Sequence, residues 1–174
     1  MRAFESLGRF DPYELQLCRL LNQVENPAAL ALFRAVSWLG DWSLWPILAT
    51  ALLLIDGRAA LPALRHWALF SLVTMIVYKG IKNGLARERP CVKHAGISAL
   101  VVPLDRYSFP SGHTLHAVAF TAMLGQFYPA LLWGLVPYTV LVAFSRVILG
   151  VHYPSDVLAG AALGALLAAL AASF

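Results

Sequence analysis

The sequence has little charge, little cysteine and no apolar leader. Only 13% of its 174 residues are Asp, Glu, Lys or Arg, whereas soluble domains carry roughly a quarter. Disordered chains need a high charge fraction, so intrinsic disorder is excluded as well. The two cysteines, Cys18 and Cys91, are too few for a disulfide framework and lack a metal-binding spacing, so we expect free thiols. Residues 1–23 carry charges and no signal-peptide core, and we expect them to stay on the mature protein.

Apolar residues, by contrast, make up 60% of the chain, and its mean hydropathy is +0.70. This composition indicates an integral membrane protein, which we expect to form one domain over residues 1–174. The formal net charge is +4, but the basic residues lie beside apolar stretches and form no separate arm. We therefore expect anionic membrane lipid, and no nucleic acid, as the partner.

Five apolar stretches approach the roughly 20 residues that a membrane-spanning helix needs. They are residues 40–55, 66–86, 111–127, 130–149 and 154–172. The sequence therefore predicts an all-α fold, a polytopic membrane bundle of about five transmembrane helices within residues 40–174.

Residues 1–39 fit helices that lie at the membrane interface. One is predicted to begin at Asp11, a suitable N-cap before Pro12, and a second covers residues 27–39. Four tryptophans predict an aromatic belt at the headgroups and not a binding pocket: Trp38, Trp42, Trp45 and Trp67. Small residues around Gly160 and Gly164 predict that the last helix packs closely on a neighbour.

Ionisable residues gather at one end of the predicted spans. Alternation of the spans puts the long segment 87–110 on the same face as the short turn 150–153. A charge near membrane depth is costly unless it is paired or solvated, so such a cluster marks a candidate functional site.

The first segment of this site holds Lys82 and Arg89, which are seven residues apart. If the helix continues to Pro90, both cations share one face and can bracket an anion. The alternative is that the two side chains only reach toward the headgroups, as basic residues at span ends often do.

The second segment is the run Pro110, Ser111, Gly112 and His113. Pro and Ser favour a helix start, and the free amides of a first helical turn make a seat for phosphate. Gly112 would let a ligand approach the backbone, and His113 would stand beside that seat as a titratable group. An ordinary helix cap is the alternative.

The third segment holds Ser145, Arg146, His152 and Asp156. A tight turn before Pro154 would hold His152 at the membrane surface. A carboxylate at Asp156 can accept the imidazole N–H and leave the other nitrogen as a nucleophile. Arg146 would add a fork for phosphate oxygens. The alternative is a surface histidine capped by an aspartate.

The order, spacing and residue identities of the three segments together resemble the three-part signature of the type 2 phosphatidic acid phosphatase superfamily. The likeness covers roughly residues 40–172. It implies that His152 attacks phosphorus and forms a phosphohistidine, that Asp156 orients His152, and that His113 protonates the leaving oxygen and then activates water. The implied phosphate-binding residues are Lys82, Arg89, Ser111, Gly112 and Arg146.

We predict that the chemistry needs no metal and no other cofactor. Phosphoryl transfer depends on positioning and positive charge, which three basic side chains and a helix N-terminus can supply. The remaining carboxylates form no cluster for a divalent ion, because Asp156 is engaged, Glu88 lies among arginines and Asp105 is single.

We therefore expect an enzyme that hydrolyses a lipid phosphate. Undecaprenyl diphosphate is favoured because the compact body leaves little room for a large headgroup; phosphatidylglycerol phosphate, phosphatidic acid and lipid A remain alternatives. By resemblance, the protein lies in a bacterial cytoplasmic membrane with its site facing the periplasm or the outside. A catalytically silent lipid-binding protein is the alternative class, although binding alone needs neither nucleophile nor acid.

Overall fold

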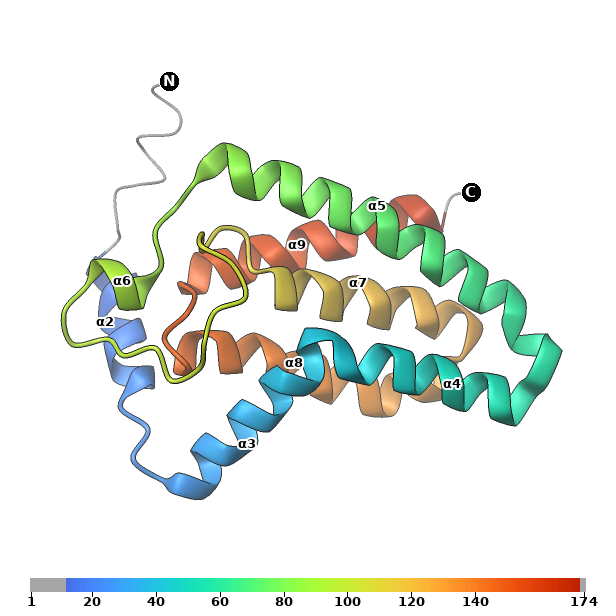
Figure 1. The fold of residues 1–174 in the computed structure, drawn as a ribbon, viewed down its shortest axis with the longest axis horizontal. Helices are drawn as coiled ribbons and strands as arrows, with labels where there is room; N and C mark the ends of the chain where they lie inside the picture. Colours follow the sequence, from blue (N-terminus) through green and yellow to red (C-terminus); the bar gives the residue numbers. More distant parts are fainter. Residues whose placement is uncertain (1–11, 173–174) are drawn as a thin grey trace.

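Every regular element among the residues that the structure describes is a helix (Figure 1). The computed structural model describes residues 12–172, apart from the side chain of Trp42. In chain order the elements are α2 (Pro12–Asn22), α3 (Pro27–Trp38), the π-helix η1 (Leu39–Ser43), α4 (Leu44–Asp56), the 3₁₀-helix η2 (Gly57–Ala60), α5 (Leu61–Leu85), α6 (Pro90–Lys93), α7 (Gly112–Phe127), the 3₁₀-helix η3 (Pro129–Leu131), α8 (Leu132–Ile148) and α9 (Pro154–Ala171). The predicted all-α fold is confirmed.

Three stretches of the described residues are long and apolar enough to cross a membrane. They are Leu44–Lys93, Pro129–Ile148 and Pro154–Ala171. Long helices lie at all five predicted positions, but α4 has 13 residues and α7 has 16, fewer than the roughly 20 that a span needs. Three stretches thus have the length and apolar composition of membrane-spanning helices. The number of five crossings stays a prediction.

Two helices precede this bundle, as predicted, and the second continues into it. Helix α3 begins after Asn26, whose side chain accepts hydrogen bonds from the amides of Ala28 and Ala29 at 2.9 and 3.2 Å. Asp11, the predicted cap of α2, lies outside the described residues. Because α3 runs through η1 into α4 without a loop, the predicted boundary at residues 39 and 40 falls inside a continuous helical stretch.

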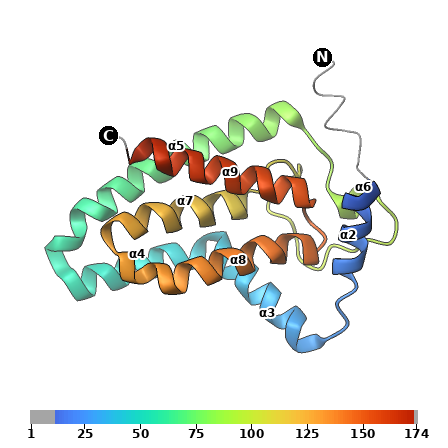
Figure 2. The ribbon, with the colours of Figure 1, turned by 180° about the vertical axis from the view of Figure 1, so that it is seen from behind.

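Helix α7 lies at the centre and packs on α5, α8 and α9 (Figures 1 and 2). Helices α4 and α5 meet at η2 and diverge toward the opposite end, where α2, α6 and the segment 94–111 lie. In the core, Phe120 meets Trp45 and Trp67 edge-on at 4.9 and 5.6 Å between ring centroids. Trp45 is buried, so the prediction that it belongs to a headgroup belt is wrong, while Trp38 is exposed.

The small residues of α9 pack against α7 of the same chain. A Cβ at Gly160 would lie 2.6 Å from the carbonyl oxygen of Ser111, and one at Gly164 would lie 2.5 Å from that of Leu115. The predicted close neighbour is therefore α7. This contact also brings the two helix starts together, because the amide of Ser111 donates to the carbonyl of Asp156 at 3.0 Å.

Candidate active site

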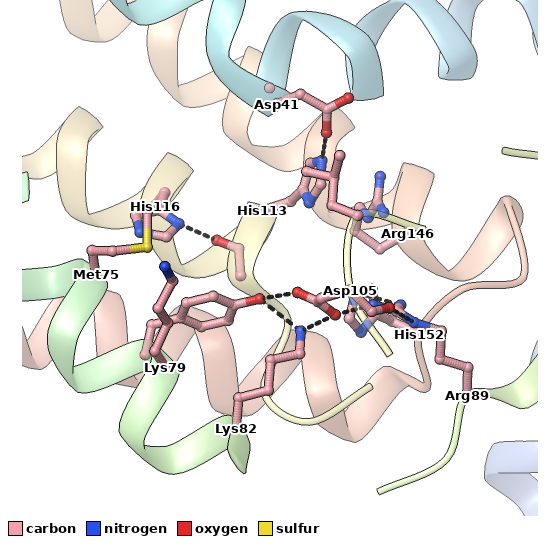
Figure 3. Close-up of a pocket in the computed structure, with 14 residues that line it drawn as sticks. Asp41, Met75, Lys79, Lys82, Arg89, Asp105, His113, His116, Arg146 and His152 are labelled. Carbon is pink, nitrogen blue, oxygen red and sulfur yellow. Dashed lines mark hydrogen bonds and ion pairs between the residues drawn. The ribbon is translucent and has the colours of Figure 1, made fainter. Parts of the chain in front are cut away.

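A cavity of about 350 Å³ opens at the end of the bundle where α4 and α5 diverge (Figure 3). Its walls come from η1, α5, the loop before α7, the start of α7, the end of α8 and the turn before α9. Six of the eight predicted site residues line it: Lys82, Arg89, Gly112, His113, Arg146 and His152. The other two, Ser111 and Asp156, are fully buried beside it.

Lys82 and Arg89 meet in the cavity, but not on one helix. Helix α5 ends at Leu85, and Ala86 takes a left-handed conformation with φ of 46°. Arg89 lies in extended backbone, and Pro90 begins α6 instead of ending α5, so the predicted helical continuation is wrong. Proline suits a first helical position because its missing N–H is not needed there.

Asp105 joins the two cations. Its Oδ1 lies 2.7 Å from Lys82 Nζ and 2.6 Å from Arg89 Nη2, and its Oδ2 accepts a 2.5 Å hydrogen bond from the Tyr78 hydroxyl. Burial acts to raise the pKa of Asp105, but the hydrogen bonds from Lys82 and Tyr78 outweigh it and hold this pKa below its ordinary value. Lys82 and Arg89 therefore do bracket an anion, and here the protein's own loop supplies it.

His152 lies in the turn between α8 and α9 with 2% of its surface exposed. Arg89 Nη1 donates to its Nε2 at 3.2 Å, and because a guanidinium only donates, Nε2 carries the lone pair. Burial first, and then the charges of Arg89 and Arg146, lower the pKa of His152 well below 6.5. The ring is thus neutral with Nε2 available for nucleophilic attack.

Asp156 does not bond directly to His152 in this structure. The two side chains face each other at 3.6 Å between Nδ1 and Oδ2, too long for a hydrogen bond. Instead, Oδ2 accepts the amide of Tyr153 at 2.8 Å, and Oδ1 accepts Arg87 Nη1 at 2.6 Å. The predicted hydrogen bond is replaced by an electrostatic contact from a carboxylate that the backbone and Arg87 fix in place.

Helix α2 extends this arrangement through Glu14. One Glu14 oxygen accepts Arg87 Nη2 at 3.1 Å, and the other accepts the amide of Ser155 at 2.8 Å. The sequence did not identify Glu14 or Arg87 as residues of the site. Arg87 lies within the first segment and its charge was a signal, whereas nothing in the sequence pairs Glu14 with the turn before α9.

His113 begins the first turn of α7 and contacts a carboxylate that the sequence did not reveal. Its Nε2 pairs with Oδ1 of Asp41, which lies on η1 (Figure 3). Arg146 also lines the cavity, where its Nη1 donates to the Ser37 hydroxyl. The Nε of Arg146 is buried and has no hydrogen-bond partner among the described residues. Arg146 therefore keeps hydrogen-bonding capacity for an anion.

The start of α7 serves packing as well as binding. The Ser111 hydroxyl pairs with that of Thr114 at 3.0 Å, so it is turned away from the cavity. A Cβ at Gly112 would lie 2.7 Å from the ring of Tyr78. The ring of Tyr78 therefore occupies the space that the missing side chain of Gly112 leaves. The Tyr78 hydroxyl also accepts a 2.6 Å hydrogen bond from Lys82.

A second, largely apolar cavity of about 580 Å³ lies between α4, α5 and α7. Trp45, Trp67 and Phe120 form part of its wall. It shares four lining residues with the first cavity: Gly40, Asp41, Met75 and His116. An apolar space therefore adjoins the charged one on the side where α4 and α5 diverge.

The charges of the first cavity suit an anion of several charges. It is lined by four basic residues, Lys79, Lys82, Arg89 and Arg146, but by only two carboxylates, Asp41 and Asp105. Among the described residues, no group of three or more His, Cys, Asp or Glu is placed to hold a metal ion.

Comparisons with known proteins agree on one family. The model of the PAP2 superfamily matches residues 64–174. The chain is 36% identical over 155 residues to the decaprenylphosphoryl-5-phosphoribose phosphatase of Mycobacterium tuberculosis, covering 84% of this chain and 81% of that protein. It is 30% identical to the lipid A 1-phosphatase of Rhizobium etli, covering 80% and 69%, and 33% identical to the undecaprenyl-diphosphatase of Sulfolobus acidocaldarius, covering 87% and 73%.

Two solved structures share the fold. LpxE of Aquifex aeolicus aligns with a TM-score of 0.82 at 24% identity, covering 95% of this chain and 98% of that one. A transmembrane PAP2-type phosphatidylglycerolphosphate phosphatase of Bacillus subtilis aligns with a TM-score of 0.75 at 23% identity, covering 99% and 90%. At these identities the two structures bear on the fold alone, which this chain shares with both.

The ring of His152 is expected to stay neutral at mildly acidic pH. Since its pKa lies well below 6.5 in the folded protein, the proton that an unfolded chain binds near pH 6.5 is absent from the folded one. The free energy of unfolding therefore falls as the pH drops below about 6.5. Carbon-13 NMR of histidine-labelled protein, assigned with His152→Ala, should show a constant His152 shift from pH 8 to about 5.5. Titration of that signal near 6.5, as in the denatured protein, would contradict the neutral ring.

Proposed function

We propose, since this chain belongs to the PAP2 superfamily, that it hydrolyses a phosphate ester or diphosphate on a membrane lipid through a phosphohistidine intermediate. Membership supports the lipid phosphatase activity, and the relatives act on membrane lipid or polyprenyl phosphates. One observation carries the finer mechanism: a single cavity brings two anion-bracketing cations, the neutral nitrogen of His152 and the ring of His113 together.

The first chemical step would begin when the lipid phosphate replaces Asp105 between Lys82 and Arg89. His152 Nε2 attacks phosphorus, a P–N bond forms and the P–O bond to the lipid breaks. A proton moves from the His113 imidazolium to the leaving oxygen. Asp156, fixed by Arg87 and the Tyr153 amide, offsets the positive charge that develops on the His152 ring.

The second step would return the enzyme to its starting state. His113, now neutral, takes a proton from a water molecule as that water attacks phosphorus. The P–N bond breaks, inorganic phosphate leaves, and His152 regains its neutral nitrogen. Lys82, Arg89 and Arg146 supply positive charge to the phosphoryl oxygens in both steps, a role that metal ions share with basic residues in many phosphotransfer enzymes. We therefore propose hydrolysis without a metal or other cofactor.

The apolar cavity supports a substrate whose chain enters between α4 and α5. Its volume of about 580 Å³ falls within the roughly 300–1,000 Å³ typical of ligand pockets. One adjoining space suits one chain beside the phosphate, which favours single-chain polyprenyl phosphates over lipids with several chains. Two relatives named for decaprenyl and undecaprenyl substrates point the same way, and undecaprenyl diphosphate is the substrate we favour. The Rhizobium etli relative makes lipid A the second candidate.

Wild-type protein in detergent micelles with EDTA is expected to release phosphate from undecaprenyl diphosphate faster than from lipid A, phosphatidylglycerol phosphate or phosphatidic acid. His152→Ala should abolish release from all four because it removes the nucleophile. His66→Ala, at an exposed histidine of α5 that lines neither cavity, is the matched control and should keep wild-type activity. An alkaline quench should trap labelled phosphate on the wild type and on His66→Ala, but not on His152→Ala.

Three results would contradict this proposal. Activity that is lost in EDTA and regained with Mg²⁺ would overturn metal independence. Equal turnover by His152→Ala and the wild type would remove the phosphohistidine. Absence of release from all four lipids by a protein that still binds vanadate would favour the catalytically silent lipid-binding protein.

Narrowing the apolar cavity is expected to weaken binding of long chains. Ala68→Phe adds a ring inside the cavity, whereas Val73→Phe adds one on an exposed part of the same helix. Displacing one methylene of the substrate from the cavity removes about 0.8 kcal/mol of binding free energy, which raises KM about fourfold. We expect this rise for undecaprenyl diphosphate with Ala68→Phe, but not for dimethylallyl diphosphate, whose chain ends near the phosphate. Equal effects on both substrates, or from both variants, would place the chain elsewhere.

For the location, we propose a bacterial cytoplasmic membrane with the cavity facing the periplasm or the outside. Cys91, partly exposed on α6 at the cavity end, reports on that face, while Cys18 is buried. Burial raises the pKa of the Cys18 thiol to about 12, so it stays unreactive. A membrane-impermeant maleimide should label wild-type protein in intact cells and leave Cys91→Ser unlabelled. Labelling only after permeabilisation would reverse the orientation.

A further inference from the structure

Asp41 lies outside the family match and outside all three sequence segments, yet it contacts the proposed acid. The match begins at residue 64, and Asp41 is on η1, before α4. Its Oδ1 pairs with His113 Nε2, a contact that Figure 3 shows at the edge of the cavity. Asp41 also borders the apolar cavity, so it lies where the charged and apolar spaces meet.

The local backbone is shaped to make this contact. The five residues Leu39–Ser43 form a π-helix between two α-helices. Such single-turn insertions weaken a helix and are frequent at functional sites. Gly40 adds space, since a Cβ there would lie 3.2 Å from the Tyr138 hydroxyl and 3.6 Å from Cδ2 of His113. A Cβ at position 40 would therefore press on Tyr138 and come into van der Waals contact with the His113 ring.

The charges around His113 leave Asp41 as its counterion. Apart from Asp41 and Asp105, the charged and imidazole groups that line the cavity with His113 are Lys79, Lys82, Arg89, Arg146 and His152 from other elements, and His116 one turn further along α7. Asp105, the other carboxylate in the cavity, is held by Lys82 and Arg89. A proton on His113 would stand among cations, and the Asp41 carboxylate offsets that repulsion.

We propose that Asp41 is a positioning residue for the acid–base step of His113, an inference that rests on the proposed function. An ionised carboxylate only accepts hydrogen bonds, so the contact with Asp41 keeps a proton on Nε2 of His113. The proton on Nδ1 is then the one that passes to the leaving oxygen as the P–O bond breaks. His113 remains as a neutral ring with Nε2–H on Asp41 and a free Nδ1 lone pair, which takes the proton of the attacking water in the second step.

The contribution of Asp41 should depend on the leaving group. An alkoxide needs a proton as it departs, whereas a nitrophenolate or a phosphate is a much weaker base and depends far less on one. Loss of Asp41 should therefore slow the cleavage of an alkyl phosphate much more than that of an aryl phosphate or a diphosphate. A residue that only stabilised the fold would slow all of them alike.

Kinetics of Asp41→Asn in micelles test this dependence, with dodecyl phosphate and a dodecyl-substituted nitrophenyl phosphate as substrates. General acid–base catalysis supplies roughly 10²–10⁴-fold, so kcat/KM on the alkyl substrate, which reports the steps up to P–O cleavage, should fall at least about tenfold. Vanadate binding and kcat/KM on the aryl substrate should change little. Asp41→Glu should recover part of the loss, and Asp56→Asn, the same change at the exposed far end of α4, should behave as wild type. The double variant His113→Ala with Asp41→Asn should be no slower than His113→Ala alone.

Nitrogen-15 NMR of labelled histidine tests the same contact without turnover. At pH 9, where the ring carries a single proton, we expect His113 of the wild type and of Asp56→Asn to be the Nε2–H tautomer, and this preference to be lost in Asp41→Asn. An equal loss of kcat/KM on both substrates, or a tautomer unchanged by Asp41→Asn, would overturn the role of Asp41. Because the NMR result holds whether or not a substrate is cleaved, failure of this inference and failure of the proposed function are separate outcomes.

Discussion

The structure depends on keeping Lys82, Arg89 and Arg146 buried next to a membrane. Each has 5% or less of its surface exposed, and an unpaired buried cation is strongly unfavourable. The protein meets this demand with acceptors from distant parts of the chain: the Asp105 carboxylate, the Val151 carbonyl, and the hydroxyls of Tyr78 and Ser37. The packing of α3, α5 and α8 around the cavity therefore follows from charge neutralisation as much as from apolar contact.

The same demand explains why a loop carboxylate lies where a substrate phosphate would bind. Asp105 has one charge and satisfies Lys82 and Arg89, while the Nε of Arg146 keeps no partner among the described residues. A phosphate group carries more charge and more acceptor oxygens than a carboxylate, so it can meet all three cations at once. The exchange of Asp105 for a phosphate replaces one ion pair by another and avoids exposing bare charges to lipid.

Much of this could be predicted from the sequence, because phosphoryl chemistry uses few residue types at fixed spacings. The helix positions followed from apolar runs, and the cavity gathered six of eight predicted residues. The end of α5 could not be predicted, since Ala86 gives no signal for its left-handed conformation. Asp41 and Glu14 were missed for another reason. Each reaches its partner, His113 or Arg87, only through tertiary packing of helices that precede the family match.

In the proposed mechanism, both missed carboxylates act on the chemistry through another side chain. Glu14 holds Arg87, which holds Asp156 opposite His152, and Asp41 holds His113 directly. A histidine ring can be turned and tautomerised at small energetic cost, so a site with two histidines needs partners that fix each ring. The N-terminal helices supply Asp41 to the His113 ring directly, and through Glu14 they hold the Arg87–Asp156 pair that faces the His152 ring. This gives α2 and the α3–η1 stretch a task in the acid–base geometry beyond contact with the membrane surface.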